Sequence, residues 1–289
     1  MRYEKAVQTS GEWEHILLLG CDSQKVGDYE RSDTMIVASI NGDGEARLTS
    51  IMRDIWVDIP GHGEGKINAA VVYGGPELAM RVVSECLDLP IDKYAMVNMK
   101  GMVKLIDLLG GVDLEISEIE RLWINFGTDD VLRITHSRRV IRPLKHSGPV
   151  HLCGAQAVEY ARDRTTGADF RRTERQRQLL KALAQKVRTK KSLPRLIHLA
   201  IRGRKWVRTN LELPEILRLA PLALRLDPDG IGSFRIPAEG TYTVNSEGIW
   251  RFETDLEKNR QLLREFLKSG GGNKAEPPLQ NSREGTVIE

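Results

Sequence analysis

The chain has 289 residues, of which 40% are hydrophobic and 29% charged, values that are ordinary for a globular protein with a substantial core. Its three cysteines lie far apart and form no C-x-x-C pair, which argues against a disulfide framework. The histidines fall in no zinc-binding spacing, and no segment approaches the roughly 20 apolar residues that a membrane span requires. With no signal peptide visible either, we expect the chain as it stands to be soluble.

The net charge of +3 is distributed unevenly. Residues 162–191 carry eleven Lys and Arg against three acids. Such a segment binds a polyanion or a phosphorylated small molecule, or it forms a long solvated helix. No helix-turn-helix, aromatic RNA-binding pattern or zinc knuckle accompanies this charge, so nucleic acid is not expected as a partner.

Strands and helices alternate in the first half of the sequence. Short apolar runs predict buried strands over 15–20, 34–40, 46–51, 94–97 and 112–116. Helical spacing predicts one helix after Gly74-Gly75, with Pro76 in its first turn. A second helix is capped by Asn98 and ends at Gly110-Gly111. This order favours an α/β fold.

The middle of the chain loses this pattern. Residues 118–149 are polar and aromatic, with Pro143 and Gly148 as breakers, and we interpret 118–150 as a long insertion loop of the kind that forms a lid. Helices are predicted beyond it over 152–161, 173–190, 193–201, 214–226 and 255–267, with a strand over 231–236. The predicted organisation is an arm over 1–14, one domain over 15–268 and a disordered Gly- and Pro-rich tail over 269–289.

Acids and arginines gather where the early strands end. Asp22 follows the first strand, Asp33 precedes the second and Arg53 follows the third, while Arg31 lies close to Asp33. Ligands bind at strand ends of an α/β sheet because side chains are free to converge there. Two carboxylates brought together need a divalent cation such as Mg²⁺, a shared proton or a neighbouring arginine. The alternative is a set of strand-end caps and surface ion pairs.

A second cluster surrounds the junction of two predicted helices. Arg162 and Arg164 end the first helix, and Asp169 precedes the second. The side chains that share one face of the second helix, at spacings of three and four, are Arg172, Arg175 and Gln176. Arginine pairs phosphate oxygens bidentately, and free N–H groups at a helix N-terminus add to this, so the cluster predicts a pyrophosphate site. A solvated basic helix face is the alternative.

The sequence also holds more long aliphatic side chains than a thin sheet needs. They either line a tunnel for an isoprenoid chain or pack the core, and both interpretations fit. They are Met99, Met102, Leu105, Ile106, Leu109, Leu196, Leu199, Ile201, Leu217, Leu219, Leu222 and Leu224.

Several motifs occur in an order and spacing that resemble a known family. They are Leu19-Gly-Cys-Asp-Ser, Arg31-Ser-Asp-Thr-Met, Ser50-Ile-Met-Arg-Asp, Lys66-Ile-Asn-Ala-Ala, Tyr73-Gly-Gly, Gly110-Gly-Val-Asp, Gly154-Ala-Gln-Ala-Val-Glu-Tyr-Ala-Arg-Asp-Arg and Asp169-x-x-Arg-x-x-Arg-Gln. From about residue 15 to 186 the sequence resembles the LytR-CpsA-Psr domain, whose older label is cell-envelope-related transcriptional attenuator.

The resemblance implies a three-layer α/β/α sandwich around a central mixed sheet, with an apolar tunnel for a polyprenyl tail. It implies Mg²⁺ at Asp22 and Asp33. The pyrophosphate-binding side chains that it implies are Arg31, Arg53, Arg162, Arg164 and Arg172, with Gln176 nearby. The implied reaction is phosphotransfer, in which a peptidoglycan hydroxyl attacks the sugar-proximal phosphorus of a lipid-linked glycopolymer and polyprenyl phosphate leaves. Asp33 or Asp169 would accept the proton of that hydroxyl.

Two other interpretations stay open: a pyrophosphatase or phosphodiesterase that acts on lipid-linked intermediates, and a non-catalytic module that binds polyprenyl phosphate or attenuates transcription. The resemblance also implies a place at the extracytoplasmic face of the bacterial membrane, with the membrane surface as a partner. The sequence departs from the family pattern in showing no N-terminal membrane helix. It also has Gln24 where a basic residue is usual and Cys21 where a small polar residue is commoner.

Overall fold

The structure is a computed structural model that describes residues 13–21, 31–163, 169–189 and 192–269. The predictions for Asp22, Gln24 and Arg164 lie outside the described residues. So do the predictions for most of the N-terminal arm and for the tail from residue 270 onward.

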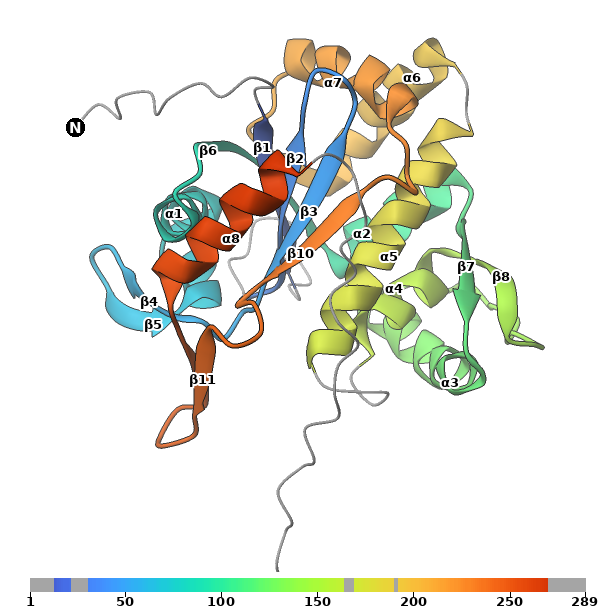
Figure 1. Cartoon of the computed structure of the whole chain (residues 1–289). Helices are drawn as coiled ribbons and strands as arrows, with labels where there is room; N and C mark the ends of the chain where they lie inside the picture. The colour runs from blue at the N-terminus through green and yellow to red at the C-terminus, as the bar shows by residue number, and fades with distance from the viewer. Residues whose placement is uncertain (1–12, 22–30, 164–168, 190–191, 270–289) are drawn as a thin grey trace, which may run out of the picture.

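Strands and helices alternate along most of the chain (Figure 1). The strands are β1 Glu14–Cys21, β2 Ser32–Ile40, β3 Ala46–Ile51, β4 Trp56–Ile59, β5 Gly63–Lys66, β6 Ile91–Asn98, β7 Val112–Ile116, β8 Gly148–Leu152, β9 Val207–Thr209, β10 Gly232–Ile236, β11 Tyr242–Asn245 and β12 Arg251–Thr254. The helices are α1 Ala70–Leu87, α2 Met99–Leu109, α3 Glu118–Ile134, α4 Gly154–Arg162, α5 Asp169–Arg188, α6 Leu193–Gly203, α7 Leu213–Arg225 and α8 Leu256–Lys268, with 3-10 turns η1 Ile67–Ala69 and η2 Arg204–Trp206.

The central sheet has the strand order β10-β3-β2-β1-β6-β9. Its pairs β1–β6 and β10–β3 are parallel, and the other neighbours are antiparallel, so the sheet is mixed as predicted. Strands β1 and β6 end side by side, because Cys21 is in register with Asn98, and β2 begins at the same edge. The sheet therefore presents the ends of β1 and β6 and the start of β2 along one edge.

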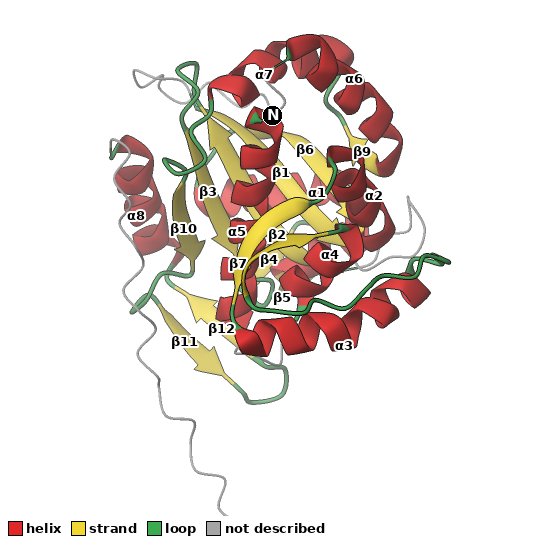
Figure 2. Cartoon of the chain, turned by 90° about the vertical axis from the view of Figure 1, so that its right-hand side faces the viewer, coloured by secondary structure: helices red, strands yellow, loops and turns green. Residues whose placement is uncertain are grey.

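Helices cover both faces of this sheet (Figure 2). Along β1, Leu17 and Leu19 belong to a core shared with α1 and α8, whereas Leu18 packs with residues of α5 on the opposite face. This alternation explains why β1 is apolar at successive positions: both of its faces are covered. The predicted α/β class, with helices on both sides of a mixed sheet, is confirmed.

The prediction of a continuous loop over 118–150 is wrong for its first half, which forms α3. Ser117 caps this helix, because its side-chain oxygen accepts a hydrogen bond from the Glu120 N–H. The Glu120 carboxylate in turn accepts a hydrogen bond from the Ser117 N–H. The helix buries Ile124, Val131 and Leu132 among α4 and its neighbours. Gly127 and the adjacent polar residues hide this short apolar stripe in the sequence. Beyond Thr135 the chain has no regular element until β8.

Candidate functional site

A cavity of about 640 Å³ lies between the sheet and the helices at the edge where β1 and β6 end. Its apolar wall on the sheet side consists of Leu18, Ile36, Ala95, Val97 and Val207. Facing these from the helices are Met99, Met102, Leu105, Val158, Leu179 and Leu180. The volume falls in the range of ordinary small-ligand pockets, and its lining suits an aliphatic ligand.

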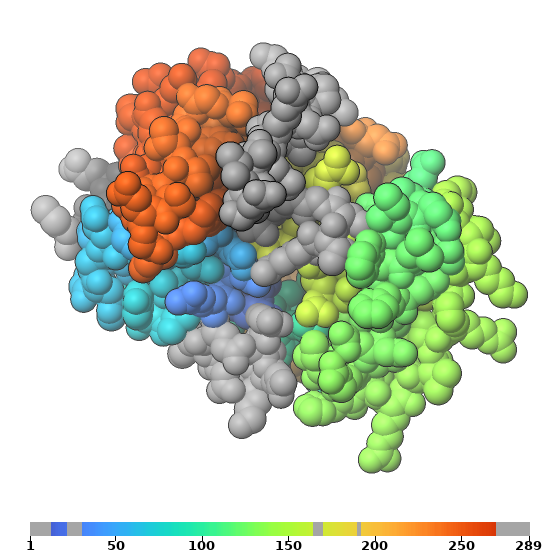
Figure 3. All heavy atoms as spheres, turned by 90° about the horizontal axis from the view of Figure 1, so that it is seen from below, coloured from blue at the N-terminus to red at the C-terminus, as the bar shows by residue number. Residues whose placement is uncertain are grey.

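The same cavity has a polar end, where β2 meets α4 and α5. Asp33, Arg162, Arg172 and Gln176 all line it. Arg172 is only 3% exposed, and its Nη2 lies 3.5 Å from the main-chain oxygen of Asp33. Figure 3 views the molecule from this end, with the early strands in blue on one side and the segment around α3 in green on the other. Apolar and charged surfaces are therefore continuous within one cavity.

Arg53, just after β3, is bound on two sides. Its Nη1 donates to Asp33 Oδ1 at 2.7 Å, and its Nε donates to Asp54 Oδ2 at 3.2 Å. Asp54 is buried and also accepts from Lys66 Nζ at 2.5 Å. This chain of alternating charges fixes Arg53 and orients the Asp33 carboxylate at the cavity wall.

Arg162 is held by an acid on its own helix. Its Nη1 donates to Glu159 Oε2 at 3.2 Å, and Glu159 also lines the cavity although it is 8% exposed. Burial raises the pKa of Glu159, and the neighbouring Arg162 opposes that rise. Gly127 of α3 makes room for this carboxylate, because a Cβ there would lie 2.1 Å from Glu159 Oε1. The close approach of α3 and α4 thus sets the position of Arg162.

Comparisons with known proteins show the family to which the chain belongs. The profile of the LytR_cpsA_psr family matches residues 2–266, which is nearly the whole chain. The chain belongs to the LytR-CpsA-Psr family. It is 30% identical over 262 residues to the polyisoprenyl-teichoic acid–peptidoglycan teichoic acid transferase TagV of Bacillus subtilis, covering 87% of this chain and 64% of that relative. The chain therefore spans less than two thirds of the length of this relative.

Solved structures of family members have the same fold. The crystal structure of B. subtilis TagV superposes with a TM-score of 0.69 at 27% identity, covering 90% of this chain and 98% of that one. A structure of TagT, also a B. subtilis protein, contains octaprenyl pyrophosphate. It matches with a TM-score of 0.63 at 25% identity, covering 93% of this chain and 95% of that one.

The structure brings together five of the side chains that the sequence singled out, namely Asp33, Arg53, Arg162, Arg172 and Gln176. Arg31 is exposed directly before β2 and does not line the cavity. Asp169 is the first residue of α5, and its side chain lies outside what the structure describes.

Arg175 departs from the expected arrangement. Its Nη1 bonds to Asp163 Oδ2 at 3.0 Å and to the Asp163 main-chain oxygen at 3.1 Å, with both side chains buried. Its Nε lies 3.8 Å from Glu120 of α3, and Arg175 does not line the cavity. The residue therefore ties the end of α4 and the start of α3 to α5, whereas Arg172 faces the cavity from the preceding turn.

Several cavity residues were missed as site residues in the sequence. Glu159 was detectable because it lies three residues before Arg162 and so on the same helix face. Asn98 was recognised only as a cap: its Oδ1 accepts from the Gly101 N–H at 2.8 Å, but its buried Nδ2 has no partner among the described residues. The α3 residues Trp123 and Phe126 also line the cavity and were assigned to a loop.

The aliphatic residues divide between the two interpretations left open. Met99, Met102 and Leu105 line the cavity. Ile106 is fully buried in the helical core, whereas Ile201 and Leu217 are exposed on α6 and α7. The cavity is thus lined mainly from α2, α4, α5 and the sheet.

The polar end fits Mg²⁺ to a limited degree. Among the residues that the structure describes, no group of three or more His, Cys, Asp or Glu side chains could hold a metal. Mg²⁺ commonly takes one or two carboxylates and completes its shell with substrate phosphates and water. Asp33 supplies one such carboxylate at the cavity wall.

Proposed function

We propose that this protein transfers a phosphate-linked glycopolymer from a polyprenyl-pyrophosphate carrier to peptidoglycan. The observation that carries the proposal is the single cavity that joins an aliphatic wall to a cluster of Asp33, Arg162, Arg172 and Gln176. An isoprenoid tail matches the first surface, and a diphosphate matches the second.

The relatives support the same assignment. TagV is named as a transferase of teichoic acid from a polyisoprenyl carrier to peptidoglycan, and TagT binds octaprenyl pyrophosphate in a closely related fold. We extend both properties to this chain because its cavity offers surfaces of the matching chemistry.

In the proposed reaction, a glycan hydroxyl forms a new O–P bond at the sugar-proximal phosphorus. The bond from that phosphorus to the bridging oxygen breaks, and polyprenyl phosphate leaves with the bonding electron pair. Arg162 and Arg172 stabilise the charge that develops on the bridging and leaving oxygens. The hydroxyl proton passes to a carboxylate, either Asp33 or Asp169. Arg53 orients Asp33.

We propose that Mg²⁺ assists this site, held by Asp33 together with Asp22 and the substrate phosphates. A bound Mg²⁺ would neutralise phosphate charge. The work of Arg162, Arg172 and Gln176 is to bind the diphosphate and hold its phosphorus in line with the acceptor.

We also propose that the protein works at the extracytoplasmic face of the membrane, where the peptidoglycan acceptor lies. Within the described ranges, none of the helices has the length and apolar character needed to cross a bilayer.

A turnover assay with a polyprenyl-pyrophosphate-linked disaccharide tests the proposal. We expect polyprenyl phosphate to be released only when a glycan acceptor and Mg²⁺ are both present. Release without the acceptor would indicate a hydrolase instead. Tight lipid binding without any turnover would indicate a binding module and would overturn the transferase proposal.

A further inference from the structure

Helix α6 and the turn η2 carry a charge pattern that the proposed reaction does not use. Between Glu174 and Glu212 the sequence has twelve Lys and Arg residues and no Asp or Glu. The outward side of this segment, which we call the α6 face, consists of Arg195, His198, Ile201, Arg202, Arg204 and Lys205, all exposed.

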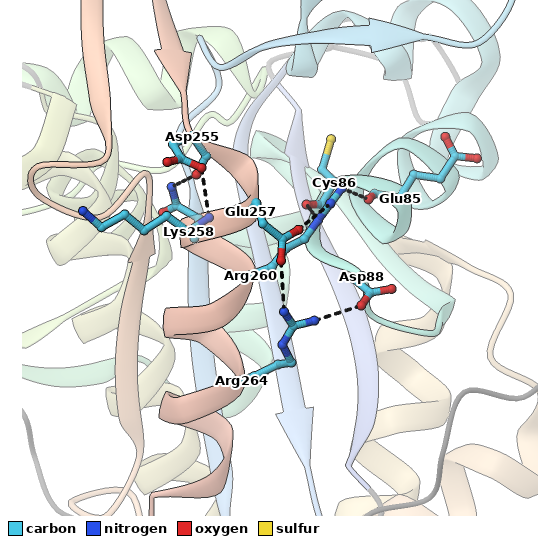
Figure 4. Close-up of polar contacts among 9 residues, drawn as sticks. Glu85, Cys86, Asp88, Asp255, Glu257, Lys258, Arg260 and Arg264 are labelled. Atoms are coloured by element: carbon cyan, nitrogen blue, oxygen red, sulfur yellow. Dashed lines mark hydrogen bonds and ion pairs between the residues drawn. The ribbon is translucent and has the colours of Figure 1, made fainter.

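The arginines of the α6 face are not neutralised by any residue within the described ranges. Arg195, Arg202 and Arg204 form no ion pair with any residue in the described part of the chain. Helix α8 is the contrasting case (Figure 4): Arg264 pairs with Asp88 at 3.1 Å, and Arg260 bonds to Glu257 and to main-chain oxygens of α1. Arg260 and Arg264 of α8 are thus paired with groups of the protein, whereas Arg195, Arg202 and Arg204 of the α6 face are presented outward.

Apolar side chains lie among these cations. Ile201 is 55% exposed on the α6 face, and Leu213 and Leu217 of the adjoining α7 are 41% and 39% exposed. None of the thirteen residues of α7 is buried, although six of them are Leu or Ile. Lys205 lies over the ring of Trp206 at 4.7 Å. Exposed aliphatics and an indole mixed with lysine and arginine are typical of surfaces that lie at the boundary of a bilayer.

The position of α6 links this face to the cavity. Gly203, the last residue of α6, packs on the cavity residue Leu105, because a Cβ at Gly203 would lie 2.9 Å from Leu105 Cδ2. Val207, just beyond η2, lines the cavity itself. Figure 1 shows α6 and α7 near the end of the sheet where β1 begins, whereas η2 leads into β9, whose Val207 pairs with Val97 close to the end of β6. Helix α6 therefore lies beside the apolar part of the cavity.

We propose that the α6 face docks on the surface of an anionic lipid bilayer. Lipid is favoured over a soluble polyanion because a polyanion would neutralise the cations and leave Ile201, Leu213 and Leu217 in water. A bilayer accepts both kinds of side chain. Docked in this way, the protein has the apolar part of its cavity next to the bilayer that carries the isoprenoid tail.

Vesicle co-sedimentation with the full chain tests the docking surface. We expect binding to vesicles of phosphatidylglycerol and phosphatidylcholine, weakened by salt, and little binding to phosphatidylcholine alone. The double variant Arg195→Gln/Arg202→Gln should bind about twentyfold more weakly at low salt. Its matched control, Lys258→Gln/Lys268→Gln, removes two exposed cations of α8 and should bind within about twofold of wild type.

A second variant separates lipid from polyanion. Ile201→Asn should weaken vesicle binding about tenfold, because the side chain no longer enters an apolar layer. It should leave binding of inorganic polyphosphate unchanged. Any of three results would overturn the proposal: an unchanged vesicle affinity of Ile201→Asn, binding of polyphosphate but not vesicles, or equal losses in the α6 and α8 double variants.

The vesicles contain no isoprenoid, and the substituted residues do not line the cavity. A failure here therefore leaves turnover of a water-soluble short-chain substrate unaffected, which distinguishes it from a failure of the transferase proposal.

Discussion

Two arginines that helical spacing places on the same face of α5 have different roles at this site. Arg172 and Arg175 are three positions apart on α5 and were expected to share a face. Arg172 lines the cavity, whereas Arg175 forms a buried ion pair with Asp163. Helical spacing predicts the common face, but a rotation of about 60° separates such positions, and only the packing of α4 shows which arginine points inward.

Arg162 is the side chain whose removal tests the cationic end most simply. It is partly exposed, and its acid partner on the same helix is Glu159, so Arg162→Ala removes charge from the cavity with little loss of packing. We expect glycopolymer transfer to fall by about 10²-fold to 10³-fold, with the thermal midpoint within a few degrees of wild type. Arg188→Ala is the control, since Arg188 forms an exposed pair with Asp227 outside the cavity. Equal losses of activity in both variants, or a large drop in the thermal midpoint of Arg162→Ala, would contradict the role.

Gly127 is predicted to act through Glu159. An alanine there would normally stabilise a helix by about 1 kcal/mol, but its Cβ would meet Glu159 Oε1 at 2.1 Å. We therefore expect Gly127→Ala to be destabilising and to weaken transfer by displacing the partner of Arg162. Chemical unfolding of the single variants and of Gly127→Ala/Glu159→Ala measures the coupling, which we expect to be about 1 kcal/mol or more. Additive effects on the free energy of unfolding would refute the contact.

At the scale of elements, the sequence predicted a helix or strand correctly where its local pattern was uninterrupted. The apolar run at residues 16–19 predicts β1, and Asn98 followed by Gly110-Gly111 bounds α2 almost as observed. Helix α3 was missed because Gly127 and the polar residues beside it break its apolar spacing, although Ser117 and Glu120 form a capping box. Its packing against α4 stabilises it despite this weak local signal.

Strand β1 supplies a prediction about acid stability. Burial lowers the pKa of His15 to about 4, and its Nδ1 lies 2.8 Å from Ser39 Oγ. The unfolded chain binds a proton below about pH 6.5, but the native chain does not until about pH 4. Above pH 6.5 His15 is neutral in both states, so it costs no stability. Below pH 6.5 protonation favours the unfolded chain, and the free energy of unfolding falls as the pH drops toward 4. We expect the loss between pH 7 and pH 4 to be about 3 kcal/mol.

Urea unfolding of wild type and His15→Gln across this pH range measures that loss. The variant should show a shallower decline of unfolding free energy than wild type. Parallel curves would show that His15 does not control acid stability.

At the scale of the whole molecule, the sequence predicted which charged residues converge at one site. It predicted only part of the lining of the cavity. Strand ends that carry Asp33 and Arg53, and a helix junction that carries Arg162 and Arg172, do converge. The partition of the aliphatic residues could not be predicted, because a leucine in a cavity wall and one in a core have the same local pattern. Long-range packing places Leu105 at the cavity and leaves Ile201 in solvent.

The most direct test of the central claim is a crystal structure of this protein with polyprenyl pyrophosphate. We predict the diphosphate within hydrogen-bonding distance of Arg162 and Arg172, and the tail along the wall that includes Leu18, Val97 and Met102. A diphosphate bound away from these arginines, or a tail that runs outside the cavity, would contradict the account.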